Sequence, residues 1–192
     1  MNIVVLGPQG SGKSTQAHKI AAYLNIPHFS TGQKVKEIDA NPNHPLNSLI
    51  KADFEAGRLV SNAVINKVLN EGVEQALKHG GFVIDGTPRS RNQVDDLDEI
   101  LDLYHQKIDL AVFIDTSVEE CKKRISLRAQ TEHRVDDTPE AIEQRLKIYF
   151  EQTLPILHEY EIRGVLVKID GNPNEETVTN SVIAVIKEKF NK

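Results

Sequence analysis

The stretch GPQGSGKST at residues 7–15 constrains what this chain can fold into more than any other part of it. It follows the apolar run Ile3–Leu6 and matches the spacing G-x-x-x-x-G-K-[ST] through Gly7, Gly12, Lys13 and Ser14. Glycines bring backbone N–H groups against phosphate oxygens, the lysine reaches the outer phosphates, and the hydroxyl can bind magnesium. A glycine-rich surface turn is the alternative. The position between a strand pattern and a helix pattern favours a phosphate-binding loop, with the positive end of the following helix facing the anion.

Short apolar runs alternate with helical patterns along the rest of the chain. The runs typical of buried strands are residues 3–6, 27–29, 82–85, 110–115 and 165–169. Strands that alternate with helices predict an α/β fold, with a parallel five-stranded sheet covered by helices on both faces, as in P-loop NTPases. In such sheets ligands bind beyond the carboxyl ends of the strands, where the glycine-rich loop lies.

Composition excludes several classes of function. The chain has 192 residues, which suits one compact domain, and its net charge of −5 argues against a general nucleic-acid or membrane-surface binder. Cys121 is the only cysteine, so no internal disulfide can form and a cytoplasmic location is expected. The seven histidines lack zinc-ligand spacing and no apolar run approaches about 18 residues, so we expect neither zinc nor a membrane span. We also expect a monomer.

Asp85 ends the apolar run Phe82–Ile84 and is followed by Gly86-Thr-Pro-Arg89. A carboxylate at the end of a buried strand, close to the phosphate-binding loop, can hold magnesium directly or through water. The alternative is an aspartate that caps a turn. Together with the loop, Asp85 and Ser14 form the expected metal site.

Five arginines stand where an ordinary surface charge is not the only explanation. They are Arg89, Arg124, Arg128, Arg134 and Arg145. Arg124 and Arg128 lie four residues apart on one side of a predicted helix, which begins with the capping-box pattern of Ser117 and Glu120. Arg134 lies in AQTEHRVDDT, which has no apolar run and is expected to be a loop. Several cations beside a phosphate loop are what phosphoryl transfer between two nucleotides requires.

The chain resembles the adenylate kinases, a group within the nucleoside monophosphate kinases, over almost its whole length. The matching pieces, in the family's order, are GPQGSGKSTQA, FSTGQ (29–33), GRLV (57–60), DGTPRS with Gln93, the arginines of KRISLR (123–128), RVDD (134–137), Arg145-Leu146 with Tyr149, and Thr153-Leu-Pro155. Pro155 is also expected to kink or break its helix. The resemblance implies the short-lid, zinc-free type, with residues 30–60 as the monophosphate segment and 128–137 as the lid of a single domain, 1–192.

The resemblance also implies roles for individual residues. ATP would be bound by Gly10, Ser11, Gly12, Lys13, Ser14, Thr15, Arg124 and Arg128, with Arg124 stacked on the adenine. AMP would be bound by Thr31, Lys36, Arg58, Leu59, Val60, Gly86, Arg89, Gln93, Arg134 and Arg145. The catalytic cations would be Lys13, Arg89, Arg124, Arg128, Arg134 and Arg145.

The implied reaction is magnesium-dependent phosphoryl transfer from ATP to AMP, giving two ADP. Four positions depart from the family pattern, namely Ser14, Gln33, Lys36 and Thr87. Lys36 keeps the charge of the usual arginine but loses its bidentate geometry. Because Gln33, Lys36 and Thr87 touch the acceptor side, the alternatives are another acceptor such as UMP or CMP, and a nucleotide-binding regulatory protein with weak kinase activity. A plain ATPase or GTPase is a further rival.

Overall fold

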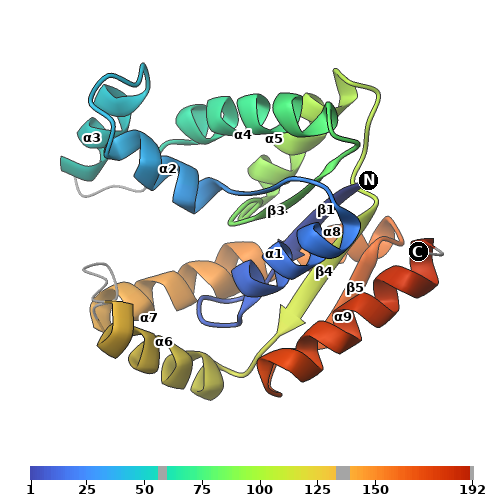
Figure 1. Ribbon diagram of the computed structural model, residues 1–192. Coiled ribbons are helices and arrows are strands. Elements are labelled where there is room, and N and C mark those ends of the chain that lie inside the picture. The colour runs from blue at the N-terminus through green and yellow to red at the C-terminus, as the bar shows by residue number, and fades with distance from the viewer. Residues whose placement is uncertain (56–59, 133–138, 191–192) are drawn as a thin grey trace.

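The computed structural model describes residues 1–55, 60–132 and 139–190. These residues form a five-stranded parallel sheet in the order β2-β3-β1-β4-β5, with helices on both faces (Figure 1). The α/β architecture expected from the alternating pattern is confirmed. The strands are β1 (Asn2–Leu6), β2 (His28–Ser30), β3 (Phe82–Asp85), β4 (Leu110–Asp115) and β5 (Leu166–Asp170).

The helices lie where the periodicity places them, with small shifts at their ends. They are α1 (Lys13–Leu24), α2 (Thr31–Asp39), α3 (Asn47–Glu55), α4 (Asn62–Leu77), α5 (Arg91–Asp102), α6 (Val118–Glu132), α7 (Pro139–Ile148), α8 (Ile156–Ile162) and α9 (Glu175–Phe190). A π-helix, η1 (Tyr149–Thr153), lies between α7 and α8. In the part of the chain that the structure describes, no helix is long and apolar enough to cross a membrane.

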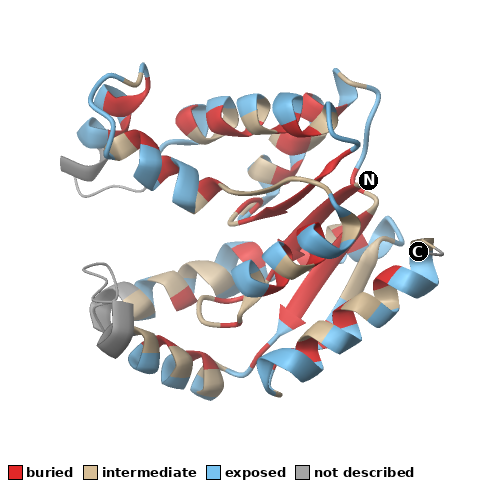
Figure 2. Ribbon diagram, in the orientation of Figure 1, coloured by how far each residue is buried: buried red, intermediate tan, exposed pale blue. Residues whose placement is uncertain are grey.

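Two hydrophobic clusters cover the two faces of the sheet, because successive side chains of a strand point to opposite sides. One cluster joins Val4 and Ile84 to α4, α5 and α8, and the other joins Ile3 and Val83 to α1 and α9. The central strands are therefore buried along their whole length (Figure 2). This burial explains why they read as continuous apolar runs and not as alternating ones.

A third cluster lies away from the sheet. Val35 and Ile38 of α2, Leu46 and Ile50 around α3, and Val64 and Val68 of α4 form a small core of their own. The segment between β2 and α4 therefore packs mainly on itself and on one side of α4. In Figure 1, α2 and α3 lie at the upper left of the view and α6 and α7 at the lower left.

The strand register brings polar residues together at the carboxyl edge of the sheet. Asp85 pairs with Val5 on one side and with Ser30 on the other. Since β1 runs directly into the glycine-rich loop, Asp85 and Ser30 lie beside that loop. The expectation that the loop and Asp85 share one edge is confirmed.

One expectation needs correction. The segment 129–138, expected to be a loop, begins as helix, because α6 continues to Glu132. The disturbance expected at Pro155 is confirmed, because the α-helix gives way to a π-helix that ends at Thr153 and α8 begins only at Ile156, although Pro155 itself keeps helical angles (φ −60°, ψ −27°). Gly57, which favours the end of a helix, and Thr138, which favours the start of one, lie outside the described residues.

Candidate functional site

The glycine-rich loop is closed by local contacts and packed tightly against α6. Ser11 N–H donates to Pro8 O at 3.2 Å, and Gly10 adopts a φ of 85°. A Cβ on Gly10 would lie 2.6 Å from the Cys121 carbonyl oxygen, closer than any side chain can approach. The left-handed backbone and the close contact both require glycine here.

Lys13 begins α1 inside this loop, and its Nζ donates to Pro8 O at 3.1 Å. Burial, and then the nearby charge of Arg89, lower the pKa of Lys13 to about 8, while the carboxylate of Asp85 acts in the opposite direction. Burial and the charge of Arg89 both disfavour the charged form of Lys13, so an anion that binds beside the ammonium group stabilises that form. The loop therefore favours a negatively charged ligand.

Asp85 lies at the centre of a polar cluster formed by three elements. Its Oδ1 accepts from Ser30 Oγ at 2.9 Å and from Ser14 Oγ at 3.2 Å, and its Oδ2 lies 2.8 Å from His28 Nε2. Burial alone would raise the pKa of this carboxyl, but the hydrogen bonds from His28 and Ser30 and the charge of Lys13 outweigh it, so the pKa lies below its usual value. Asp85 is thus held in its ionised form.

The cluster fits a magnesium ion. Carboxylate and hydroxyl oxygens are the hard ligands that Mg²⁺ prefers, and Mg²⁺ commonly takes one or two carboxylates together with substrate phosphates. Among the described residues, no group of three or more His, Cys, Asp or Glu side chains is placed to hold a metal ion. Asp85 and Ser14, which are hydrogen-bonded to each other, are residues that could hold such an ion together with phosphates.

Arg89 follows β3 and is fixed at several atoms. Its Nε donates to Gly86 O at 2.7 Å, its backbone N–H donates to Gln93 Oε1 at 2.9 Å, and its carbonyl accepts from Thr153 Oγ1 at 2.9 Å. Burial, and then the charge of Arg145, lower the pKa of Arg89, and both arginines line the same cavity. Two cations held near each other in a partly enclosed place form a site for an anion such as phosphate.

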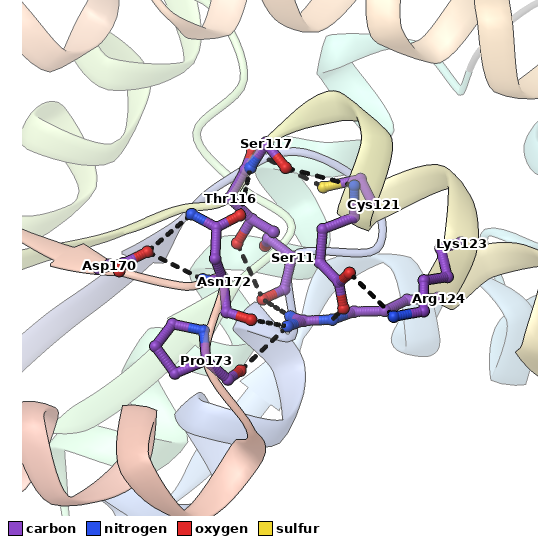
Figure 3. A network of polar contacts seen from close by, with 10 residues as sticks. Ser11, Thr116, Ser117, Cys121, Lys123, Arg124, Asp170, Asn172 and Pro173 are labelled. Carbon is purple, nitrogen blue, oxygen red and sulfur yellow. Dashed lines mark hydrogen bonds and ion pairs between the residues drawn. The ribbon is translucent and has the colours of Figure 1, made fainter.

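Arg124 joins three parts of the chain (Figure 3). Its Nη1 donates to Ser11 O at 3.3 Å, and its Nη2 donates to Asn172 O at 3.0 Å and Pro173 O at 3.1 Å. Its Nε donates to Glu120 Oε1 at 2.9 Å. The guanidinium plane is thereby held between the glycine-rich loop and the turn after β5.

Only half of the expected capping box forms. The N–H of Glu120 donates to Ser117 Oγ at 3.3 Å, as a capping box requires. The Glu120 carboxylate, however, pairs with Arg124. The charged guanidinium offers it a stronger hydrogen bond than a backbone amide does.

The expected site residues converge on one cavity of about 2350 Å³. This volume exceeds the usual range for one small ligand, about 300–1,000 Å³, and gives room for two nucleotides. The expected residues that line it are Gly10, Ser11, Gly12, Lys13, Ser14, Thr15, Thr31, Lys36, Val60, Asp85, Gly86, Arg89, Gln93, Arg124, Arg128 and Arg145. Arg58, Leu59 and Arg134 lie outside the described residues.

Gln93 was expected to contact the acceptor base, and it does line the cavity. Its amide is engaged at both ends, because Oε1 accepts from Arg89 and Nε2 donates to Asn62 Oδ1 at 3.1 Å. Gln93 therefore connects the loop after β3 to the start of α4. Ser61 occupies the N-cap position of α4, but its side chain makes no capping hydrogen bond, and the Asn62 side chain accepts from Gln93.

Sequence reasoning missed several residues of the site. His28 and Ser30 point to Asp85 from the same side of β2, and their two-residue spacing was an available signal. The carbonyl groups of Asn172 and Pro173, which hold Arg124, gave no side-chain signal at all. Thr153 was quoted only as part of a family motif, and its contact with Arg89 depends on the π-helix.

A phosphate loop after the first strand, an ionised aspartate at the adjacent strand end and clustered arginines define a P-loop nucleotide-binding protein of the phosphotransferase kind. Residues 5–165 match the family model described as adenylate kinase. The chain is 38% identical over 188 residues to an adenylate kinase of Stenotrophomonas maltophilia, which covers 97% of this chain and 100% of that protein. Similar relatives named adenylate kinase occur in Xanthomonas euvesicatoria (39% over 171 residues, 89% of this chain and 91% of the relative) and Kocuria rhizophila (34% over 185 residues, 96% and 98%).

This chain belongs to the adenylate kinase family. The resemblance drawn from the ordered motifs is therefore confirmed.

Proposed function

We propose that this protein is an adenylate kinase that transfers a phosphoryl group reversibly from ATP to AMP, with Mg²⁺, to give two ADP. The observation that carries this proposal is the convergence of Lys13, Asp85 and the four described arginines on one cavity large enough for two nucleotides. A plain nucleotide hydrolase would need a residue that orients water. Transfer between two nucleotides instead needs cations beside both the donor and the acceptor phosphates, and Lys13 and the arginines can supply them.

In this proposal the glycine-rich loop binds the ATP phosphates through its backbone N–H groups, and Lys13 follows the transferred group. Arg124 lies under the adenine and Arg128 over the phosphates. Thr31, residues 58–60 and Gln93 bind the acceptor base, and Arg89, Arg145 and Lys36 hold the acceptor phosphate. Asp85 and Ser14 hold Mg²⁺, which offsets charge on the phosphates when bound.

Catalysis by these residues is alignment and charge stabilisation, with no covalent protein intermediate. Segment 30–60 and the short lid 128–137 close over the nucleotides and exclude water, and Arg134 of the lid then joins the other cations. The small separate core of α2, α3 and α4 supports movement of the acceptor segment as a unit. The protein would act as a monomer.

A coupled assay with ATP and a panel of AMP, GMP, CMP and UMP tests the proposal. We expect AMP to be clearly preferred and activity to be lost when EDTA removes magnesium. Preference for UMP or CMP would assign another monophosphate kinase. Turnover below about 0.1 s⁻¹ with saturating AMP, against the usual enzyme range of about 1–10³ s⁻¹, would indicate a regulatory nucleotide-binding protein. Phosphate release without any acceptor would indicate a hydrolase.

A further inference from the structure

The helix that carries Arg145 contains one wide turn before it continues as α8. Leu154 N–H donates to Tyr149 O, five residues earlier, at 2.8 Å. An ordinary α-helix makes this bond to the residue four positions earlier, so the turn Tyr149–Thr153 contains one additional residue. Single π-turns of this kind are frequent at functional sites, which directs attention to what this one positions.

The local cause of the wide turn is Pro155. Proline has no N–H, and in a regular helix its ring clashes with the carbonyl four residues earlier, here that of Glu151. A wider turn moves that carbonyl aside, so the chain remains helical through Pro155 into α8. Pro155 thus favours the additional residue, although it does not by itself require one.

The wide turn changes which side chains share a face. In a regular α-helix the eight residues from Arg145 to Thr153 would span about 800°, which leaves the two side chains about 80° apart. With one residue absorbed by the wide turn the effective spacing is seven residues, about 700°, and the two side chains come within about 20° of each other. Both residues line the central cavity, as this alignment requires.

The helix face that carries Arg145 and Thr153 lies against Arg89. Thr153, only 7% exposed, donates its hydroxyl to the Arg89 carbonyl at 2.9 Å. From the other side, Gln93 Oε1 accepts the Arg89 N–H, so side chains hold both polar groups of the Arg89 backbone. The guanidinium is then fixed at Nε by Gly86 O. Arg145, on the same helical face as Thr153, is near enough to lower the pKa of Arg89.

We propose that Thr153 is a positioning residue for the acceptor phosphate: its hydroxyl, brought into place by the π-turn, fixes the Arg89 backbone so that Arg89 and Arg145 meet one phosphate together. This inference rests on the proposed function, in which these two arginines bind the monophosphate. Two guanidinium groups grip a phosphate well only when both are already in place, because ordering them during binding costs affinity. Thr153 does not touch the substrate and acts through Arg89.

The test replaces Thr153 by valine, which keeps the shape and removes the hydroxyl, and by serine, which keeps the hydroxyl. Thr179→Val is the matched control, since the Thr179 hydroxyl donates only along its own helix, to Glu175 O at 2.7 Å, and accepts from Lys19. We expect Thr153→Val to raise KM for AMP about tenfold, while KM for ATP changes less than about twofold. Thr153→Ser should stay within about 1.5-fold of the wild type in both constants.

A merely structural role for Thr153 predicts a different result. Thr153→Val would then lower the melting temperature, but KM for AMP, measured at a temperature well below the melting temperature, would be unchanged. This outcome would overturn the proposal. Serine as damaging as valine would also overturn it. Should the valine variant not fold, Thr153→Cys replaces it: a thiol is a weak donor, so we expect about a threefold rise in KM for AMP. A cysteine variant equal to the serine one contradicts the inference.

Calorimetric titration with AMP separates this inference from the proposed function. A wild type that binds AMP without turnover would refute the kinase assignment, and weaker AMP binding by Thr153→Val would still support the positioning role. A wild type that turns over AMP together with a Thr153→Val variant that binds AMP equally well would refute the positioning role alone. A wild type that neither binds nor turns over AMP refutes both.

Discussion

The glycine-rich loop 7–15, for which we propose donor binding (the donor loop), and segment 30–60, for which we propose acceptor binding (the acceptor segment), both contribute residues to the same cavity. They are attached to the rest of the molecule in different ways. The loop at residues 7–15 continues a strand that is buried along its whole length, and Gly10 packs against the backbone of Cys121. The acceptor segment joins the sheet through β2, whose three residues are only half-buried, and its helices pack around a small core of their own.

This difference shows how one site can combine a rigid half with an adaptable half. Phosphate binding by backbone N–H groups tolerates little displacement, so the donor loop gains from tight packing. We propose that the acceptor segment shifts as a unit, because its apolar side chains pack mainly on one another and on α4. It is also the part that departs most from the family pattern, at Gln33 and Lys36, and substitutions there need not disturb the central core.

The largest expected effect comes from removing the donor lysine. Lys13→Met should lower turnover by about 10³-fold, because a buried cation that offsets charge in the transition state is lost. Steady-state kinetics with saturating ATP and AMP measure this effect. Lys19→Met is the control, since Lys19 lies in the same helix but pairs with Glu175 of α9, and its activity should stay within about twofold of the wild type. A Lys13→Met variant with ordinary turnover would contradict a donor role for the loop.

A pair of glycine substitutions tests the rigid and adaptable halves against each other. Gly10→Ala should lower the free energy of unfolding by about 2 kcal/mol, because the added Cβ meets backbone and the φ is positive. Gly32→Ala, in α2, should leave it unchanged or raise it by up to about 1 kcal/mol, since the nearest atom to its added Cβ is 4.0 Å away and alanine favours helix. Urea unfolding measures both. An equal loss of unfolding free energy in the two variants would contradict the difference between the donor loop and the acceptor segment.

Lys36 sharpens the comparison on the acceptor side. It lines the cavity where the family pattern has an arginine. We expect Lys36→Arg to lower KM for AMP by about threefold and Lys36→Met to raise it about tenfold, because a guanidinium binds phosphate with two parallel hydrogen bonds and methionine with none. KM for ATP should not change in either variant. A change confined to ATP would place Lys36 on the donor side.

The smallest expected effect is the pH dependence of ATP binding. The free Lys13 has a pKa of about 8 and loses its proton as pH rises through that value, whereas bound phosphates hold the proton on. ATP affinity should therefore be fully present well below pH 8 and fall about fourfold between about pH 7 and pH 8.5. Titration calorimetry at several pH values measures it, with AMP affinity as the internal control. An ATP affinity that rises over this range would show that Lys13 is not the group that titrates.

Much of the fold was predictable because its signals are local. Buried parallel strands are continuous apolar runs, so Ile3–Leu6 and Phe82–Ile84 stand out, and the rule that ligands bind beyond the strand ends places Asp85 beside the loop. The positions of most arginines in one cavity followed from the ordered family motifs.

What could not be predicted depends on contacts that no local pattern encodes. The Arg124 contacts use backbone carbonyl groups after β5, which any residue type would supply. Pro155 signals a disturbance of the helix, but whether the chain kinks, stops or widens depends on the packing of α8 against the sheet. The residues after Arg128 were expected to be a loop but begin as the last turn of α6, and they have no apolar periodicity from which that turn could be predicted.

The three-way contact of Arg124 has a consequence for when the protein becomes competent during its synthesis. Its partners, Ser11 and the Asn172–Pro173 turn, lie far apart along the sequence. A ribosome-bound chain can therefore place the glycine-rich loop after its first strand early, yet the contacts of Arg124 cannot all form until Pro173 has emerged. A nucleotide that needs Arg124 in place would then stabilise only a chain that has been synthesised beyond this turn.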